Sequence, residues 1–91
     1  MTGSPDAVTV ATALREFIVS DLLFDRTGVD LGEDTDLFGG GLVDSVGLMR
    51  LVMHLERSYR IGVADEDLVP ENFGTVAALA RFATEKARRA E

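Results

Sequence analysis

Hydrophobic residues recur at steps of three and four along three stretches of the chain, which is the spacing of one helix face. The first stretch covers roughly residues 6 to 24, the second runs from about Ser45 to Tyr59, and the third ends near Arg89. The apolar positions of the first are Val10, Ala11, Leu14, Phe17, Ile18 and Leu22. Those of the third are Val76, Leu79, Ala80, Phe82 and Ala83. No stretch has the alternation typical of strands, so an all-α fold is predicted.

Residues that favour helix ends refine these boundaries. Ser4 is expected to cap the first helix, with Pro5 at its first position. Gly62 is expected to end the second helix in the left-handed conformation. Asn72 or Thr75 is expected to cap the last helix.

A short segment completes the predicted architecture. Residues 65–69 are expected to form one helical turn before Pro70. The chain is therefore predicted to be a four-helix bundle, with three long helices and one short third helix. We expect a single domain over residues 1–91, with a disordered or frayed N-terminus at 1–5.

A long loop, residues 26–43, is predicted between the first and second helices. It contains no periodic apolar pattern, and loops of this length in small domains usually have a function. Its large apolar residues are expected to anchor it in the core. They are Leu31, Leu37, Phe38 and Leu42. A calcium-binding EF-hand beginning at Asp34 is excluded, because Ser45 would stand where a bidentate Glu is required.

The second helix has two apolar faces. At ~100° per residue, one set of side chains falls between ~240° and ~340° from Ser45 and is predicted to face the core. This set is Leu48, Leu51, Val52, Leu55 and Tyr59. A second set, Val46, Met49 and Met53, lies beside Ser45 and is either a wide edge of the core or a docking surface. Gly47 either leaves room for a partner or relieves crowding against the loop.

Composition excludes several classes of function. The chain has 91 residues, no cysteine and a net charge of −7. Such a charge disfavours nucleic acids and anionic membranes. It either attracts partners with basic surfaces or, as charge alone favours, is a solvated acidic surface that keeps the protein soluble. No apolar run approaches the ~20 residues of a membrane span, and the N-terminus lacks a signal-peptide pattern. We expect a cytoplasmic monomer without a metal site.

The residue of greatest chemical interest is Ser45, at the point where the glycine-rich loop becomes the second helix. A catalytic serine needs a nearby base, but His54, the only histidine, lies nine residues along the same helix. This places His54 ~13.5 Å farther along the axis, so it cannot activate Ser45 and is expected to face solvent. Ser45 is then better suited as a substrate for another enzyme. The alternative is that Asp44 and Ser45 form an ordinary helix cap.

The full pattern resembles the acyl carrier protein family over nearly the whole chain. The matching segments are Asp36-Leu37-Phe38, Gly41-Leu42-Val43-Asp44-Ser45-Val46, Leu51-Val52-Met53 with Glu56, Tyr59, and Ile61-Gly62-Val63. The resemblance implies that Ser45 accepts a 4′-phosphopantetheine arm from coenzyme A, added by a phosphopantetheinyl transferase. Asp44 would help to position the transferase and its metal. The cofactor supplies the reactive thiol, so the chain needs none of its own.

The resemblance also implies a surface on the second helix that partner enzymes recognise. The residues assigned to partner binding are Val46, Gly47, Met49, Arg50, Met53, Glu56 and Arg57. The family most often has Leu after the serine and acids farther along this helix, whereas this chain has Val46, Gly47 and Arg50. Partner choice is therefore expected to differ from that of a housekeeping fatty-acid carrier.

The function favoured by these features is a discrete carrier of acyl or aminoacyl thioesters in polyketide-type biosynthesis. The expected partners are an acyltransferase or adenylating ligase that loads or unloads the arm, and a polyketide synthase. The alternatives are a D-alanyl or fatty-acid carrier, and a small helical adaptor without a prosthetic group. A hydrolase that uses Ser45 is disfavoured by the distance to His54.

Overall fold

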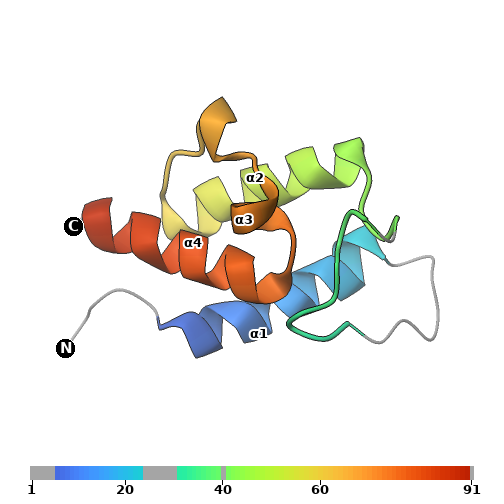
Figure 1. Ribbon diagram of the computed structural model, residues 1–91. Helices are drawn as coiled ribbons and strands as arrows, with labels where there is room; N and C mark the ends of the chain where they lie inside the picture. The colour runs from blue at the N-terminus through green and yellow to red at the C-terminus, as the bar shows by residue number, and fades with distance from the viewer. Residues whose placement is uncertain (1–5, 24–30, 40, 91) are drawn as a thin grey trace.

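Four α-helices form the framework of the computed structural model, which describes residues 6–23, 31–39 and 41–90 (Figure 1). They are α1 (Ala7–Phe17), α2 (Ser45–Tyr59), α3 (Pro70–Phe73) and α4 (Val76–Ala90). A π-helical turn, Ile18–Leu22, extends α1, and a 3₁₀ turn, Asp65–Asp67, precedes α3. The described residues contain no strand, so the predicted all-α class and the four helices with a short third one are confirmed.

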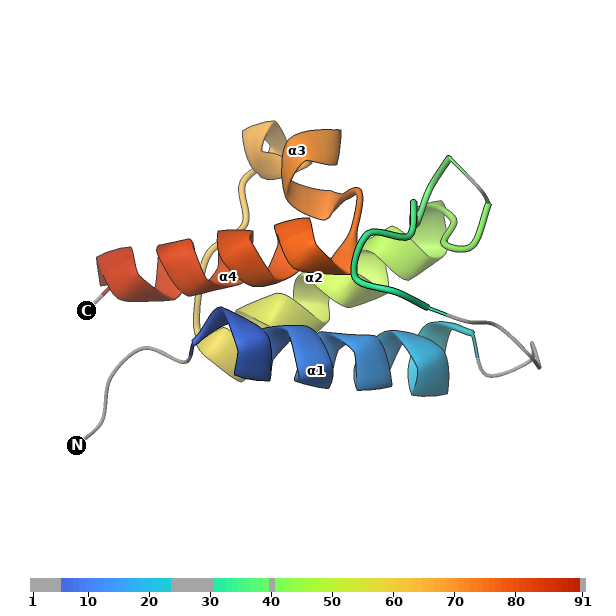
Figure 2. The same cartoon turned by 60° about the horizontal axis from the view of Figure 1, so that its bottom comes forward.

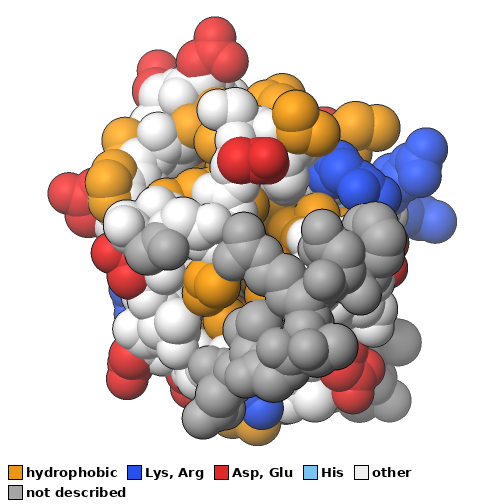
Figure 3. Space-filling model, turned by 90° about the vertical axis from the view of Figure 1, so that its right-hand side faces the viewer, with side chains coloured by type: hydrophobic (Ala, Val, Ile, Leu, Met, Phe, Trp, Pro, Cys, Tyr) orange, Lys and Arg blue, Asp and Glu red, His pale blue; other side chains and the backbone are white. Residues whose placement is uncertain are grey.

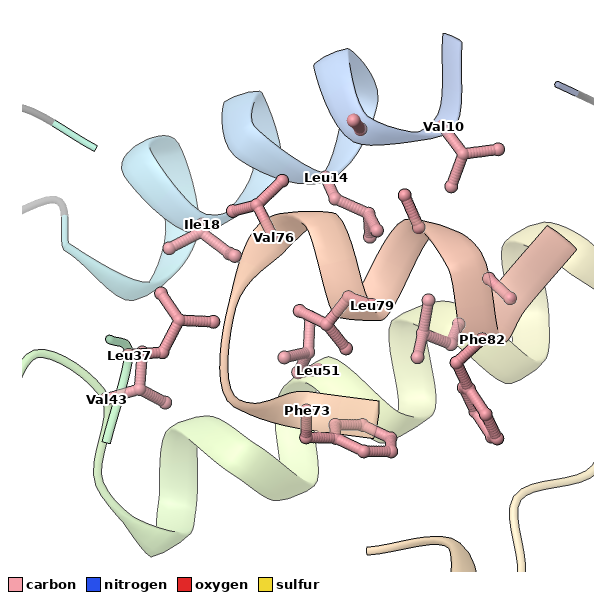
Figure 4. Close-up of a cluster of buried hydrophobic side chains, with 14 of the residues drawn as sticks. Val10, Leu14, Ile18, Leu37, Val43, Leu51, Phe73, Val76, Leu79 and Phe82 are labelled. Carbon is pink, nitrogen blue, oxygen red and sulfur yellow. The ribbon is translucent and has the colours of Figure 1, made fainter. Parts of the chain in front are cut away.

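The three long helices enclose the core, and α1 lies alongside α4 in both ribbon views (Figures 1 and 2). Leu14, Leu51 and Leu79 lie close together at the centre (Figure 4). These three leucines and Leu55 have no exposed surface. On the predicted core face of α2, Leu51, Val52 and Leu55 are buried, while Leu48 and Tyr59 are half-buried against the same cluster. The periodicity of α2 therefore identified its buried face correctly.

The start of α1 differs from the prediction. Asp6, rather than Ser4, is the N-cap, and its Oδ1 accepts a hydrogen bond from the backbone N–H of Thr9 at 2.8 Å. Ser4 and Pro5 lie outside the described residues. Asp and Ser cap helices equally well, so local sequence alone did not distinguish the two sites.

The end of α2 also corrects a prediction. Arg60, with φ 55° and ψ 46°, adopts the left-handed conformation that was assigned to Gly62. The chain must turn directly after Tyr59, because Ile61 returns to the core and is 7% exposed. The burial of Ile61 thus determines which residue must be left-handed. That residue is Arg60, although L-residues rarely adopt this conformation.

The short third element consists of two pieces instead of the single turn predicted at residues 65–69. Pro70 does not end this turn but begins α3, where its missing N–H costs nothing. Phe73 then buries its ring in the core. Of the two candidate caps for α4, Thr75 is the one used, since its Oγ1 accepts a hydrogen bond from Ala78 N at 3.1 Å.

Candidate functional site

The loop before α2 is fastened to the bundle by its backbone. The N–H of Leu37 donates to the carbonyl of Gly74, and the N–H of Val43 donates to the carbonyl of Leu37, both at 2.8 Å. The side chains of Leu37 and Val43 lie together at one end of the core, next to Ile18 (Figure 4). Earlier in the loop, the carbonyl of Glu33 accepts a hydrogen bond from Ala77 N at 3.0 Å.

The predicted anchors of the loop are confirmed. Leu31 and Leu37 are buried, and Phe38 and Leu42 are half-buried against the core. Gly41 has φ 77°, a conformation that glycine adopts without strain. The loop therefore delivers the chain to α2 from a fixed position.

Asp44 caps α2 and sets the orientation of its first residues. Its Oδ1 accepts a hydrogen bond from Gly47 N, and its backbone carbonyl accepts one from Leu48 N, both at 2.8 Å. Ser45 is the first residue of α2 and is exposed. No side chain in the described ranges forms a hydrogen bond with its hydroxyl. The hydroxyl is thus accessible to an external enzyme.

Gly47 is required by the packing of the loop against α2. A Cβ atom at this position would lie 2.9 Å from Cγ1 of Val43 and 3.4 Å from Oδ1 of Asp44. Gly47 is itself buried. This geometry favours the interpretation that Gly47 relieves crowding against the loop, and it leaves Gly47 little surface for a partner.

His54 is remote from Ser45, as predicted, but it is half-buried and does not face solvent fully. Its ring stacks on that of Phe17, with centroids 3.9 Å apart and planes inclined by 10°. Burial lowers the pKa of His54, and the charge of Asp21 acts in the opposite direction. The nearest polar partner is Ser58, whose Oγ lies 3.5 Å from Nδ1. The expectation of a solvent-facing His54 was therefore wrong.

The second apolar set of α2 is exposed. Val46, Met49 and Met53 are 68%, 51% and 52% exposed, so they form a surface strip and not an edge of the core. The strip begins directly after Ser45. Figure 3 views the molecule from the end of Figure 1 at which α2 begins, and hydrophobic and basic side chains lie side by side there.

Glu56 differs from its charged neighbours on α2. It is half-buried, and its Oε2 accepts a hydrogen bond from the backbone N–H of Val63 at 3.0 Å. Arg50 and Arg57 are exposed and form no ion pair with a described residue. Glu56 thus has a structural role in the turn after α2, which the sequence did not indicate.

A groove of about 400 Å³ opens beside the start of α2. Its apolar lining includes Leu48, one turn beyond Ser45, and Phe38 from the loop, together with Leu68, Val69 and Phe73. Asp36 is the charged residue of the described lining. This lining is otherwise apolar, so the groove can shelter a hydrophobic group held near Ser45.

The fold and this site define a class of protein: a small helical scaffold that displays a serine hydroxyl beside an apolar strip, with the single histidine of the chain stacked on another helix. The described residues contain no group of three or more acidic or histidine side chains that could hold a metal ion. No helix in the described part is long and apolar enough to cross a bilayer. Such a scaffold can present a group attached to its serine to other proteins.

Comparison with known proteins identifies the family. Residues 12–83 match the family model described as the phosphopantetheine attachment site, and the chain belongs to this family. It is a phosphopantetheine-binding carrier protein, and its prosthetic group is a covalently attached 4′-phosphopantetheine. No curated protein matches the chain significantly.

A solved structure supports the same fold. One chain in a structure described as the crystal structure of an FAD-dependent dehydrogenase is 31% identical to this protein, with a TM-score of 0.69. The match covers 77% of this chain and 97% of that chain. The similarity therefore extends over nearly all of the matched chain.

Proposed function

We propose that Ser45 is the residue that carries the phosphopantetheine arm. The exposure of its hydroxyl at the first position of α2 supports this assignment most directly. Transfer from coenzyme A would form a phosphodiester at Oγ of Ser45 and release adenosine 3′,5′-bisphosphate. The transferase must accept the hydroxyl proton, because His54 is stacked on Phe17 and distant from Ser45.

Asp44 has two parts in this proposal. Its Oδ1 already accepts the hydrogen bond from Gly47, which fixes the first turn of α2. Asp44 is exposed, and a carboxylate has further lone pairs beyond the one used by Gly47, so it can also approach the metal of a bound transferase. The carrier would thus contribute one acidic ligand or contact next to the hydroxyl that reacts.

The cargo that we propose is an acyl or aminoacyl group, held as a thioester in polyketide-type biosynthesis. The groove next to Ser45 has an apolar lining, which suits hydrophobic parts of such a cargo. A D-alanyl or fatty-acid carrier is the alternative function. The chain would act as a single-domain cytoplasmic monomer, loaded and unloaded by an acyltransferase or adenylating ligase, with a polyketide synthase as a further partner.

A flavin-dependent dehydrogenase is also among the partners that we propose. The support is the 31% identical chain in a structure described as an FAD-dependent dehydrogenase. Such an enzyme would remove a hydride and a proton from the thioester-bound cargo and reduce FAD to FADH₂. Loaded carrier mixed with a flavoenzyme from the same genomic neighbourhood should lose two hydrogen atoms per cargo, and unchanged cargo would argue against this partner.

Intact-mass measurement tests the attachment site. Apo protein incubated with coenzyme A and a broad-range phosphopantetheinyl transferase should gain the mass of one phosphopantetheine. Ser45→Ala should gain nothing, whereas Ser58→Ala, which changes another exposed serine of α2, should be modified like the original chain. Modification that persists in Ser45→Ala would refute the assignment.

A further inference from the structure

The exposed side of α2 differs in charge from the rest of the molecule. The chain as a whole carries a net charge of −7. Within α2, however, the only acid is Glu56, and its carboxylate is engaged with the backbone N–H of Val63. The exposed charges of this helix are those of Arg50 and Arg57. A partner that docks on α2 therefore meets positive charge first.

The two arginines lie along one edge of the apolar strip formed by Val46, Met49 and Met53. Arg50 and Arg57 are seven residues apart, or about two turns, so they lie on the same side of α2. Together with Met53 between them, they line a groove of about 440 Å³ between α2 and the end of α1. Among the described residues that line this groove, Asp21 is the only acid, and it forms no ion pair with either arginine. Both guanidinium groups are available for external carboxylates.

The distance between a charged group and the docked partner determines how strongly that group acts on the partner. At physiological ionic strength, charges more than about 8 Å apart are largely screened from one another. Acids beyond this distance weaken the approach of an acidic partner but contribute little at the contact itself. Asp21 is within the groove, and it forms no ion pair with either arginine. Bidentate pairing with carboxylates is the interaction that arginine makes best.

We propose that α2 docks on a partner surface in which carboxylates flank an apolar depression. The depression receives Met49 and Met53, and the carboxylates pair with Arg50 and Arg57. This inference rests on the proposed carrier function and specifies the kind of enzyme surface that function requires. It is the opposite of the basic surface that the net charge of the chain predicts.

Two synthetic helical peptides provide a direct test. Both carry the same leucine and alanine face; one has flanking glutamates and the other has flanking lysines. Each is titrated into the ¹⁵N-labelled holo-carrier, and the amide shifts of residues 46–57 are followed. The glutamate peptide should perturb these amides. The inference is wrong if the lysine peptide perturbs them equally or more, or if neither peptide does.

Matched charge reversals complete the test. Arg50→Glu with Arg57→Glu should weaken binding of the glutamate peptide on the order of tenfold. Arg81→Glu with Arg88→Glu makes the same charge change at the same spacing on exposed positions of α4, and it should leave binding unchanged. Equal weakening by both pairs would show a general charge effect and overturn the inference.

The outcome is separable from that of the proposed function. If Ser45 gains phosphopantetheine but the peptides are not distinguished, only the inference about the docking partner fails. If Ser45 gains no mass, the carrier assignment of that residue fails, whichever peptide binds. Thermal unfolding of the arginine variants serves as the control for folding. We expect melting temperatures close to that of the original protein, because exposed side chains without ion pairs contribute little to stability.

Discussion

The imidazole of His54 lies flat against the ring of Phe17, with 3.9 Å between the ring centroids. The contact joins the middle of α2 to the end of α1 and half-buries the only histidine of the chain. Burial lowers the pKa of this histidine from its ordinary value of 6.5, although the charge of Asp21 opposes the shift.

The stability of the protein should therefore fall on mild acidification. Below pH 6.5 the unfolded chain binds a proton at His54 more readily than the folded chain does, so protonation favours unfolding. We expect the unfolding midpoint to decrease between about pH 7.5 and about pH 5.5, before most carboxylates titrate. His54→Phe retains a stacked ring without a titrating group and should reduce this dependence. The same pH profile in both proteins would contradict the prediction.

Replacement of Asp44 should separate its two roles. Asp44→Ala removes the acceptor for Gly47 N and should lower the unfolding free energy by about 1 kcal/mol. Asp44→Asn retains a capping oxygen but removes the charge, so stability should change little while modification by the transferase slows. Urea titration measures the first effect and intact mass against time the second. Modification of the Asn variant at the original rate would exclude a role for the charge.

Gly47 should be one of the few glycines inside helices whose replacement by alanine does not stabilise the protein. Gly→Ala inside a helix ordinarily stabilises by roughly 0.5–1 kcal/mol. Here the added Cβ would lie 2.9 Å from Cγ1 of Val43, so we expect Gly47→Ala to destabilise by about 1 kcal/mol or more. In a double-mutant cycle, Val43→Ala should relieve part of this loss. Strict additivity of the two changes would show that the contact is unimportant.

The hydrogen bond from Val63 to Glu56 should contribute to folding and not only to recognition. Glu56→Ala leaves the half-buried N–H of Val63 without its acceptor, at an expected cost of about 1–2 kcal/mol. Glu56→Gln offers a neutral acceptor of the same shape and should cost less. Chemical denaturation of both variants checks this order. Full stability of the Ala variant would be inconsistent with the bond.

Substitutions on the two faces of α2 should have different consequences. Met49→Ser or Met53→Ser removes an exposed side chain and should change stability by less than about 1 kcal/mol. Leu51→Ala or Leu55→Ala leaves a cavity at a fully buried position and should cost about 2–5 kcal/mol. Thermal or urea unfolding distinguishes the two classes, and a large loss at either methionine would show that it supports the core.

The long helices could be predicted from the sequence because the residues on a buried helix face must be hydrophobic, and these residues recur every three to four positions. Leu51 and Leu55 are one turn apart on α2 and both are fully buried, so the pattern of the chain reports their face directly. Ser45 could be placed at the start of α2 for a related reason: the residue before it, Asp44, is a strong cap.

The remaining features depend on contacts between distant segments. Arg60, not Gly62, turns the chain because Ile61 must reach the core. The hydrogen bond of Glu56 and the stacking of His54 join residues whose proximity no local pattern indicates. Gly47, two residues after Ser45, likewise allowed two interpretations, and only the position of Val43 favours one of them.

The backbone of Leu37 has a mechanical consequence. Its N–H holds the corner between α3 and α4 through Gly74, and its carbonyl holds Val43, two residues before Ser45. A force applied at Ser45 is therefore transmitted through these two hydrogen bonds to the corner between α3 and α4. With the arm on Ser45, as we propose, the attachment point is tied to the bundle through these two hydrogen bonds, and we expect the reach of the cargo to come from the arm itself.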